Sequence, residues 1–351
     1  MRADKAKQNR KKSRKGLIVA VIIVLIVIAL GAAAYFIFFQ KDDSNTGIKK
    51  VSDKLTDPLT GEEVDSLLAR PIQFSIDNAE NTRPQEGLSY ADIVFEYPVE
   101  GSITRLQAIF YSQLPDVVGP VRSARPYFVD TAREYKAVFV NHGWSPAAKK
   151  YLESGVVPYI SGLTCGGGVF YRATDRPAPH NSMVDTEKLQ AKIKDEGYDK
   201  KQDVRTFNFL KKGETVKGTA EDEITINYLT IEPSYKYDKE NNVYKRYVNG
   251  EKYTDKATGK QITAANVLIQ YVDATATDAK GRLDIDMTAG GKALLFRKGK
   301  MIKGTWSRKD LDSSTIFKAE NGKEMKMATG NTWIQVVDQS DKVTYSADED
   351  Q

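Results

Sequence analysis

An uncharged, strongly apolar segment near the N-terminus constrains this 351-residue chain more than any other feature. No charged residue occurs from Leu17 to Phe39. At about 1.5 Å per helical residue, this length is enough to cross the roughly 30 Å hydrocarbon core of a bilayer. Residues 1–16 hold eight basic residues and one acid, which favours a cytoplasmic N-terminus. The sequence therefore predicts a basic cytoplasmic tail at residues 1–16, one transmembrane helix at residues 17–39 and an extracellular main part.

A cleaved signal peptide is the alternative interpretation of the same segment. The stretch Ala32–Ala34 has the small residues of a cleavage site. However, the apolar residues continue to Phe39, which completes a membrane span and has no use in a discarded peptide. Both interpretations place the main part of the chain outside the cytoplasm.

The net charge of the chain comes from its tail. The chain has a formal charge of +5, and the eight basic residues and one acid of residues 1–16 contribute +7, so residues 17–351 sum to −2. Nucleic-acid binding needs a basic face, which a nearly neutral main part does not offer. We therefore expect the lipid bilayer to be a partner of the N-terminal region and expect no nucleic acid to be bound.

The sequence also lacks the usual motifs for covalent crosslinks, metals and cofactors. The single cysteine, Cys165, excludes an intrachain disulfide. Neither a ligand-spaced H-E-x-x-H motif, nor a Walker loop, nor a G-x-G-x-x-G fingerprint occurs. We expect no metal and no cofactor.

The chain after the apolar segment divides into a tether and two folded parts. Residues 40–70 are polar and acid-rich and are typical of a tether. From residue 71 to 200, apolar runs alternate with helical patterns, which predicts an α/β domain, with α+β as the other possibility. Strands are expected at 72–76, 93–97, 103–111 and 137–140, and helices at 126–135, 146–154 and 185–194.

Residues 201–345 lack strong helical patterns and predict a β-rich domain. The turn dipeptides Asn241-Asn242, Gly299-Lys300 and Asn321-Gly322 separate runs that are typical of strands. Strands are expected at 224–228, 235–237, 243–248, 267–272, 293–297 and 333–337.

Polar residues follow two of the expected strands in the first domain. Asp77 and Asn78 come after one strand, and the stretch from Asn141 to Trp144 comes after another. In open α/β sheets, ligands bind outside the carboxyl ends of the strands. These residues therefore mark a candidate site, although strand ends also carry residues that only cap the chain.

Two arginines flank Ser123 just before the helix expected at Pro126. Arg122 and Arg125 fit a site that binds an anion, because guanidinium groups match carboxylate and phosphate geometry and a helix start adds N–H donors. The alternative is a pair of surface arginines, each paired with a local acid.

The two histidines of the chain, His142 and His180, both fall in the first domain. Pro177 and Pro179 stiffen the loop that presents His180, which also contains Asp175 and Arg176. Together with a carboxylate, the two histidines are candidates for acid–base work near neutral pH. Two purely structural histidines are the other possibility.

Several ordered motifs occur from Asp57 onward, namely Asp57–Gly61, Asn81–Leu88, Ala91–Glu96, Glu100–Arg105, Gly119–Arg125 and Pro179–Asn181. Together they resemble the YerB-type lipoprotein family. The resemblance implies a two-domain extracytoplasmic protein of mostly Gram-positive bacteria, without implying a reaction. The chain departs from the lipoprotein pattern in having no cysteine directly after its apolar segment.

Two classes of function fit these observations. The first is an envelope module that binds an anionic wall component or another envelope protein, with ligand contacts from Asn78, Arg105, Arg122, Ser123, Arg125, Arg176 and Asn181. The second is an envelope hydrolase or transferase that uses His142 and His180 with a carboxylate from Asp77, Glu96 or Asp175. The sequence leaves open whether the protein is an enzyme. Both classes predict that these residues converge on one cleft.

Overall fold

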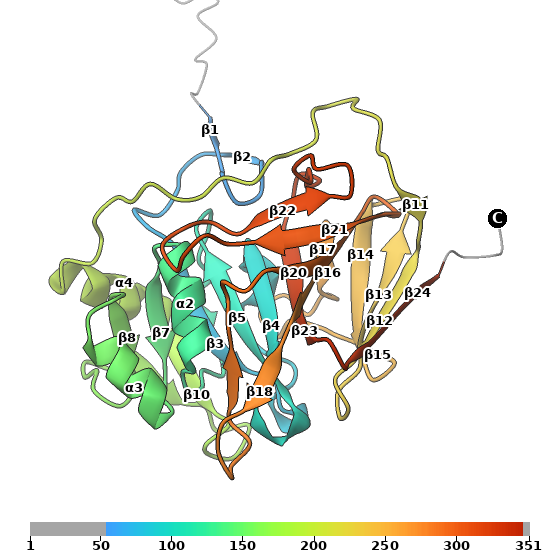
Figure 1. The fold of residues 1–351 in the computed structure, drawn as a ribbon. Coiled ribbons are helices and arrows are strands. Elements are labelled where there is room, and N and C mark those ends of the chain that lie inside the picture. Colours follow the sequence, from blue (N-terminus) through green and yellow to red (C-terminus); the bar gives the residue numbers. More distant parts are fainter. Residues whose placement is uncertain (1–53, 347–351) are drawn as a thin grey trace, which may run out of the picture. The chain divides into compact units, whose positions relative to one another are not determined.

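The computed structural model describes residues 54–346 (Figure 1). The predicted tail, the predicted membrane helix and the first part of the predicted tether lie outside this range. Among residues 54–346, none of the helices is long and apolar enough to cross a membrane.

The largest sheet has eleven strands (Figure 1). Ten of them follow one another in the order β11 (Thr219–Ala220), β21 (Lys300–Ser307), β20 (Gly291–Arg297), β17 (Asn266–Val272), β23 (Thr332–Asp338), β4 (Ile93–Pro98), β5 (Thr104–Phe110), β3 (Ile72–Asp77), β7 (Val138–Asn141) and β8 (Tyr159–Ser161). The eleventh strand, β22 (Ile316–Ala319), pairs with β21. Every strand of this sheet that was expected from an apolar run forms.

This sheet contains strands from both parts of the folded chain. β4 and β23 pair in parallel, with Ile93 opposite Thr332 and Glu96 opposite Gln335. β23 also pairs in parallel with β17. The composition change near residue 200 therefore does not separate two sheets.

The expectation of an α/β arrangement for residues 71–200 is met only in part. β3, β5 and β4 pair antiparallel, whereas β3, β7 and β8 pair in parallel. Alternating strand–helix units would give parallel neighbours throughout. The segment instead forms strand-rich structure with a mixed sheet, closer to the α+β possibility.

Smaller sheets surround the large one. A six-stranded sheet consists of β15 (Glu251–Lys252), β14 (Val243–Val248), β13 (Pro233–Asp238), β12 (Glu223–Asn227), β24 (Lys342–Ser346) and β16 (Thr263–Ala264), the last pairing with β14. A three-stranded sheet consists of β6 (Val117–Val118), β10 (Ser182–Asp185) and β9 (Phe170–Arg172). Two further sheets have two strands each, β1 (Leu55–Thr56) with β2 (Glu63–Val64) and β18 (Ala274–Ala276) with β19 (Leu283–Ile285).

Two of the three α-helices in residues 54–346 begin after a residue whose side chain caps the first turn. Ser145 accepts a hydrogen bond from the Ala148 N–H, and Asp185 accepts one from the Lys188 N–H, so both side chains satisfy free donors of a first turn. The helices are α2 (Pro126–Glu134), α3 (Pro146–Glu153) and α4 (Thr186–Asp195), with short 3-10 turns η1 (Glu80–Thr82), η2 (Leu88–Tyr90) and η3 (Glu100–Ser102).

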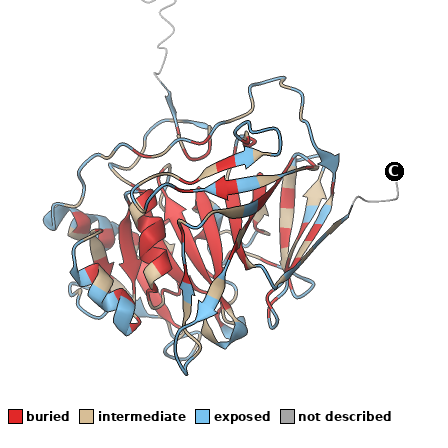
Figure 2. Ribbon diagram, viewed as in Figure 1, coloured by how far each residue is buried: buried red, intermediate tan, exposed pale blue. Residues whose placement is uncertain are grey.

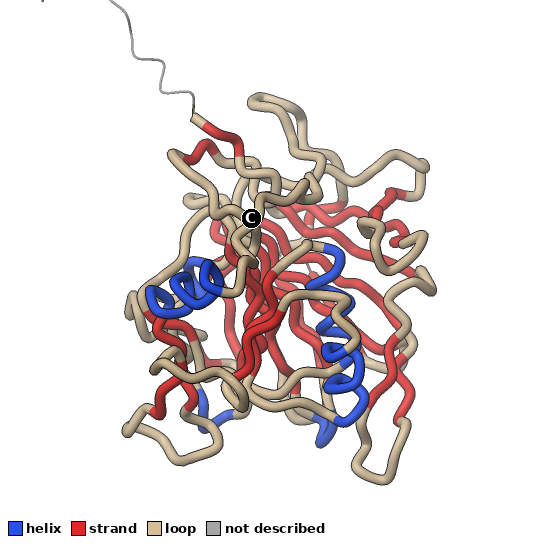
Figure 3. The backbone as a smooth tube through the Cα atoms, turned by 90° about the vertical axis from the view of Figure 1, so that its left-hand side faces the viewer, coloured by secondary structure: helices blue, strands red, loops and turns tan. Residues whose placement is uncertain are grey.

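Alternating side chains of the large sheet enter two separate cores. On β4, Ile93, Phe95 and Tyr97 pack with the apolar faces of α2 and α3. Val94 belongs to the other core, together with residues of α4 and of the six-stranded sheet. Figure 2 shows the central strands mostly buried, and Figure 3 shows helices on both sides of the strands.

Part of the predicted tether belongs to the folded unit. β1 and β2 form a hairpin at residues 55–64, and Leu59 in its turn is completely buried. Asp57 accepts hydrogen bonds from the Leu59 N–H and the Thr60 hydroxyl, which holds the turn closed.

Candidate functional site

Residues 119–125 form a crossing segment that passes the carboxyl ends of β3 and β7. The Asp77 N–H donates to the Pro120 carbonyl, and the Arg122 N–H donates to the Ser75 carbonyl. Further along, the Ala124 N–H donates to the Gly143 carbonyl. Because β3 and β7 are parallel, their carboxyl ends lie at the same edge of the sheet. The crossing segment therefore brings its arginines to the edge that the sequence marked as a candidate site.

Asp77 is the centre of this edge. Its carboxylate is almost completely buried, and its Oδ2 atom lies 2.9 Å from Arg122 Nε and 2.7 Å from His180 Nδ1. Its Oδ1 atom accepts a hydrogen bond from the Ala79 N–H. About a quarter of each of the His180 and Arg122 side chains is exposed (25% and 23%). One buried oxygen thus holds an imidazole and a guanidinium side by side at the surface.

Two more arginines lie behind this pair. Arg105 is directly opposite Asp77 in the β3–β5 pairing, and its Nη1 donates to the Ser123 carbonyl at 2.8 Å. Arg125 forms a two-point ion pair with Glu100. Asp77, Arg105, Arg122, Arg125 and His180 are referred to below as the Asp77 cluster.

Positive charge is incompletely balanced in the Asp77 cluster. Arg105 is 4% exposed, its Nε has no hydrogen-bond partner, and no carboxylate among residues 54–346 lies within ion-pair distance of it. Burial, followed by the charge of Arg125, lowers the pKa of Arg105 to about 10, although Asp77 and Glu100 oppose this shift. Three guanidinium groups thus share two carboxylates.

His142 lies beside the Asp77 cluster but makes different contacts. Its Nδ1 is 2.6 Å from the Ser182 hydroxyl, and its Nε2 is 3.5 Å from Arg172 Nη2. Burial, then the charges of Arg172 and Arg122, lower the pKa of His142. A Cβ atom at Gly162 would lie 2.5 Å from Nδ1, so glycine is required for the ring to occupy this place.

The contact with Arg172 favours one tautomer of His142. A guanidinium can only donate, so the contact favours an accepting Nε2 and a proton on Nδ1, which then donates to Ser182. In this tautomer His142 does not take a proton from the Ser182 hydroxyl.

Ser123 contributes its backbone rather than its hydroxyl group. Its carbonyl accepts from Arg105, and its hydroxyl lies 3.4 Å from the His142 carbonyl. Asn181 closes the His180 loop, because its side chain donates to the Ala173 carbonyl and accepts from Arg172. Ser123 thus supports the site through its carbonyl group, and Asn181 does so through its side chain.

Asn78 and Glu96 belong to a separate, fully buried network. Asn78 Nδ2 donates to Glu96 Oε1 at 3.0 Å, and Thr104 donates to the same oxygen. Arg246 lies 2.6 Å from Glu96 Oε2, and Gln335 donates to that oxygen as well. Asn78, Glu96, Thr104, Arg246 and Gln335 are referred to below as the Glu96 network. The network satisfies the carboxylate, and both Glu96 and Arg246 are inaccessible to solvent.

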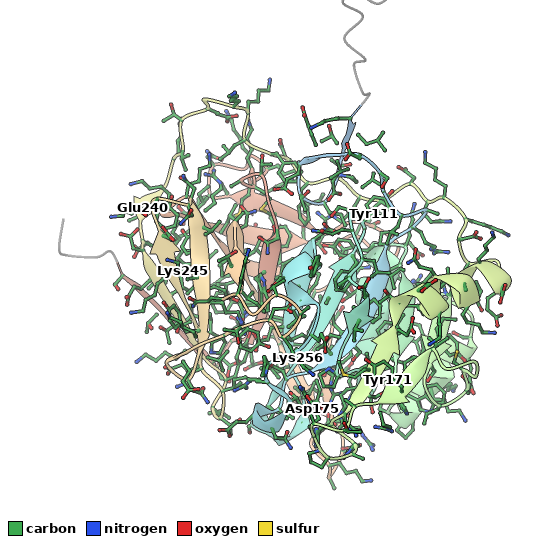
Figure 4. All side chains as sticks on the ribbon, turned by 180° about the vertical axis from the view of Figure 1, so that it is seen from behind. Tyr111, Tyr171, Asp175, Glu240, Lys245 and Lys256 are labelled. Carbon is green, nitrogen blue, oxygen red and sulfur yellow. The ribbon has the colours of Figure 1, made fainter. Side chains whose placement is uncertain are left out.

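Asp175 and Arg176 form an ion-paired group of their own. Arg176 donates to Asp175 and to the carbonyls of Thr82 and Pro84. Lys256 Nζ is 2.9 Å from Asp175 Oδ2, and Figure 4 shows the two side chains together. Hydrogen bonds from Arg176 and Lys256 lower the pKa of Asp175 to about 2.

The hydrogen bonds and ion pairs of the predicted residues form three groups, namely the Asp77 cluster, the Glu96 network and the Asp175–Arg176 pair. Arg172, Ser182 and Glu100 contact the predicted residues but were not among the predicted site residues. Arg172 lies on β9, which pairs with β10. No local sequence pattern distinguishes it from a surface arginine. Among residues 54–346, no group of three or more His, Cys, Asp or Glu side chains is arranged to hold a metal ion.

The cluster contains groups of the kind that contact anions and exchange protons. His180 uses Nδ1 for Asp77, and its Nε2 has no partner within residues 54–346. With Nδ1–H donating to the carboxylate, Nε2 is free to accept or to release a proton. The adjacent Arg122 guanidinium is suited to an oxyanion.

Comparison with known proteins gives consistent matches over most of the folded unit. Residues 59–199 match the family model described as "Protein of unknown function (DUF3048) N-terminal domain", and residues 224–334 match the corresponding C-terminal domain. The protein called "Putative lipoprotein YerB" from Bacillus subtilis (strain 168) is 38% identical over 302 residues, which cover 84% of this chain and 90% of that protein. The crystal structure of YerB from Bacillus subtilis matches with a TM-score of 0.76 and 37% identity, covering 83% of this chain and all of that one.

Proposed function

Because this chain belongs to the YerB family with DUF3048 N- and C-terminal domains, we propose that it is a membrane-anchored extracytoplasmic envelope protein that binds an anionic ligand. The ligand group binds at the Asp77 cluster. The observation that carries this proposal is the shared contact of Arg122 and His180 with one buried oxygen of Asp77, next to Arg105, which forms no ion pair within residues 54–346.

The anchor in this proposal is the apolar segment at residues 17–39. The name of the relative describes a lipoprotein, whose anchor is attached to a cysteine. The cysteine of this chain, Cys165, is far from the apolar segment, so the segment itself holds the protein at the bilayer. Intact-mass measurement of membrane-extracted protein tests this anchor. A soluble product that starts near Tyr35 would show that the segment is a cleaved signal peptide.

Charge balance supports the binding of an anion at the Asp77 cluster. Three arginines brought together against two carboxylates repel one another unless a further negative charge is present. Arg122 and His180 are the members that reach solvent, so the incoming group contacts them first. Each can donate a charge-assisted hydrogen bond to an oxyanion.

Titration with inorganic phosphate tests the proposal directly. The chain has two histidines, so an NMR spectrum of the imidazole Cε1–H groups contains two signals, and the one missing in His180→Ala belongs to His180. We expect phosphate to move the His180 signal with saturation, and sodium chloride to weaken the effect. An unchanged His180 signal, or equal changes at both histidines, would contradict binding at the Asp77 cluster.

The Asp77–His180 contact also supports a second function, in which the protein hydrolyses its ligand. An imidazole oriented by a buried carboxylate is an arrangement suited to a general acid or base. The substitution His180→Ala separates the two functions. A hydrolase would lose about 10²- to 10⁴-fold in rate with little change in affinity. A binding module would lose affinity alone.

A further inference from the structure

A polar groove of about 780 Å³ lies apart from the Asp77 cluster. None of its lining residues belongs to that cluster or to the Glu96 network. Its walls come from both family domains and from the segment between them. The groove has four lysines in its lining, Lys211, Lys212, Lys260 and Lys298, and is called the lysine groove below.

Positive charge in the lysine groove is unbalanced. All four lysines are exposed, and none forms an ion pair with another side chain of residues 54–346. The groove contains two acids, Glu62 and Asp92. Asp92 is almost completely buried, and its carboxylate accepts hydrogen bonds from the Tyr111 N–H and the Ser112 N–H. Backbone donors, rather than the lysines, thus contact this carboxylate.

The backbone holds these lysines in place from three separate loops. The Leu210 N–H donates to the Met327 carbonyl, which ties down the loop of Lys211 and Lys212. Lys298 occupies the tight turn between β20 and β21, and the Lys260 carbonyl accepts from the Asp255 N–H. The fold therefore fixes the positions of the backbone segments that carry these four lysines.

Uncharged polar groups line the rest of the groove. Gln113 and Thr329 are exposed and make no hydrogen bonds within residues 54–346, and Tyr90 presents a partly buried ring. Few large apolar side chains are present, so the groove lacks the hydrophobic pockets that anchor most peptides. Amides, hydroxyls and an amphipathic ring instead match the hydroxyl-rich surface of sugars.

We propose that the lysine groove binds an acidic polysaccharide. The lysines pair with negative groups spaced along the polymer, and Gln113, Thr329 and neighbouring amides bind sugar hydroxyl groups. This site is independent of the anion site at the Asp77 cluster, since the two share no residue.

Binding of polygalacturonate, which carries one carboxylate per sugar, tests this proposal with the full chain in detergent. The double substitution Lys260→Gln/Lys298→Gln is compared with Lys280→Gln/Lys292→Gln, which removes the same charge from exposed lysines outside the groove. The basic tail is present in every variant, so its contribution cancels from the affinity ratio. We expect about a tenfold loss for the groove variant and little change for the control.

Two further measurements separate polysaccharide recognition from general attraction to anions. Dextran, a neutral polymer, should bind far more weakly than polygalacturonate, and Gln113→Ala should weaken polygalacturonate binding without affecting duplex DNA binding. Equal losses in the groove and control variants would overturn the proposal. So would a Gln113→Ala variant that binds both polymers like the wild type, because the groove would then recognise charge without recognising sugar.

Discussion

The Asp77 cluster and the Glu96 network contain neighbouring residues of the chain, Asp77 and Asn78, but differ in their surroundings. In the Asp77 cluster, two of the side chains that contact the Asp77 carboxylate reach solvent, and arginines outnumber carboxylates. Asn78 points into the Glu96 network, where the Glu96–Arg246 pair is completely buried. The same residue types thus form a candidate binding site at one position and a structural core at the next.

The two groups differ in whether each buried arginine has a carboxylate partner. Both oxygens of Glu96 are satisfied within residues 54–346, and Arg246 also stacks on Trp333 with its guanidinium carbon 4.2 Å from the ring centroid. Burial is the largest single influence on the Arg246 guanidinium and lowers its pKa, but the interactions with Glu96, Tyr235 and Tyr253 together outweigh burial and raise the pKa. Arg105 has no such carboxylate, and its pKa is lowered. Incomplete pairing, rather than the presence of arginine, marks the site.

The largest expected effect is on stability when Arg246 is removed. Arg246→Met leaves the buried Glu96 carboxylate without its cation and should lower the free energy of unfolding by about 3 to 5 kcal/mol. Urea denaturation followed by tryptophan fluorescence measures this loss. The double variant Arg246→Met/Glu96→Gln should recover part of it. Arg122→Met should cost much less, because His180 still contacts Asp77, and an equal cost would remove the distinction between the two groups.

Removal of Arg122 should affect binding more than stability. Arg122→Ala is expected to cost about 1.5 to 3 kcal/mol of anion binding, the usual range for hydrogen bonds to charged groups. Calorimetric titration with inorganic phosphate measures the loss. Arg282→Ala is a suitable control, since it removes an arginine paired with Asp278 outside the cluster. Similar losses in both variants would mean that phosphate is attracted by overall charge and not by the cluster.

Asp57 and Asp92 are buried carboxylates that form no ion pair within residues 54–346, and they provide a third arrangement. Burial and then the charge of Asp57 raise the pKa of Asp92 to about 7. In the unfolded chain this carboxyl loses its proton near pH 4. Between about pH 4 and 7 the folded state holds the proton and the unfolded state does not, so the free energy of unfolding falls as the pH rises.

The substitution Asp57→Asn should weaken this dependence on pH. For each unit by which the pKa shift of Asp92 becomes smaller, the free energy of unfolding should fall by about 1.4 kcal/mol less between pH 4 and 8. Asparagine can still accept from the Leu59 N–H, so the hairpin turn should persist. Urea denaturation of both proteins at several pH values provides the measurement. Parallel stability curves would show that Asp57 does not act on Asp92.

The smallest expected effect concerns His142. Burial and then the charge of Arg172, 3.5 Å from Nε2, lower the pKa of His142, so Arg172→Gln should raise that pKa. Because the folded pKa is below the unfolded value of about 6.5, the neutral ring favours folding above that pH, and the benefit is lost as the pH falls. NMR titration of the two imidazole signals measures the shift. No shift in Arg172→Gln would also remove the argument for the Nδ1–H tautomer.

Local patterns in the sequence predicted most of the secondary structure. The apolar residues of β4, β5 and β7 alternate between two cores, those of β3 all enter one core, and this period of two is visible without knowing any partner. Ser145 and Asp185 indicate helix starts because capping involves residues three positions away. The turn dipeptide Asn241-Asn242 lies between β13 and β14 for the same local reason.

Features that join distant parts of the chain could not be predicted from such patterns. The pairing of β4 with β23 merges two predicted units into one sheet, although the paired residues are more than 200 positions apart. The partners of Arg176 include the carbonyl groups of Thr82 and Pro84, more than 90 positions away. A carbonyl acceptor has no sequence signature, because every residue carries one.

The sequence by itself determined where charge, turns and apolar faces lie along the chain, including Asp77 and the parallel strand end that carries it. Only the tertiary structure decided which charged side chains have a partner of opposite charge. Arg246 reaches Glu96 from 150 positions away and converts a candidate catalytic carboxylate into part of the core. Arg105 receives no carboxylate and stays unbalanced beside Asp77. The physical reason is that the energy of a buried charge depends on its partners in space, and residues far apart in the chain supply those partners.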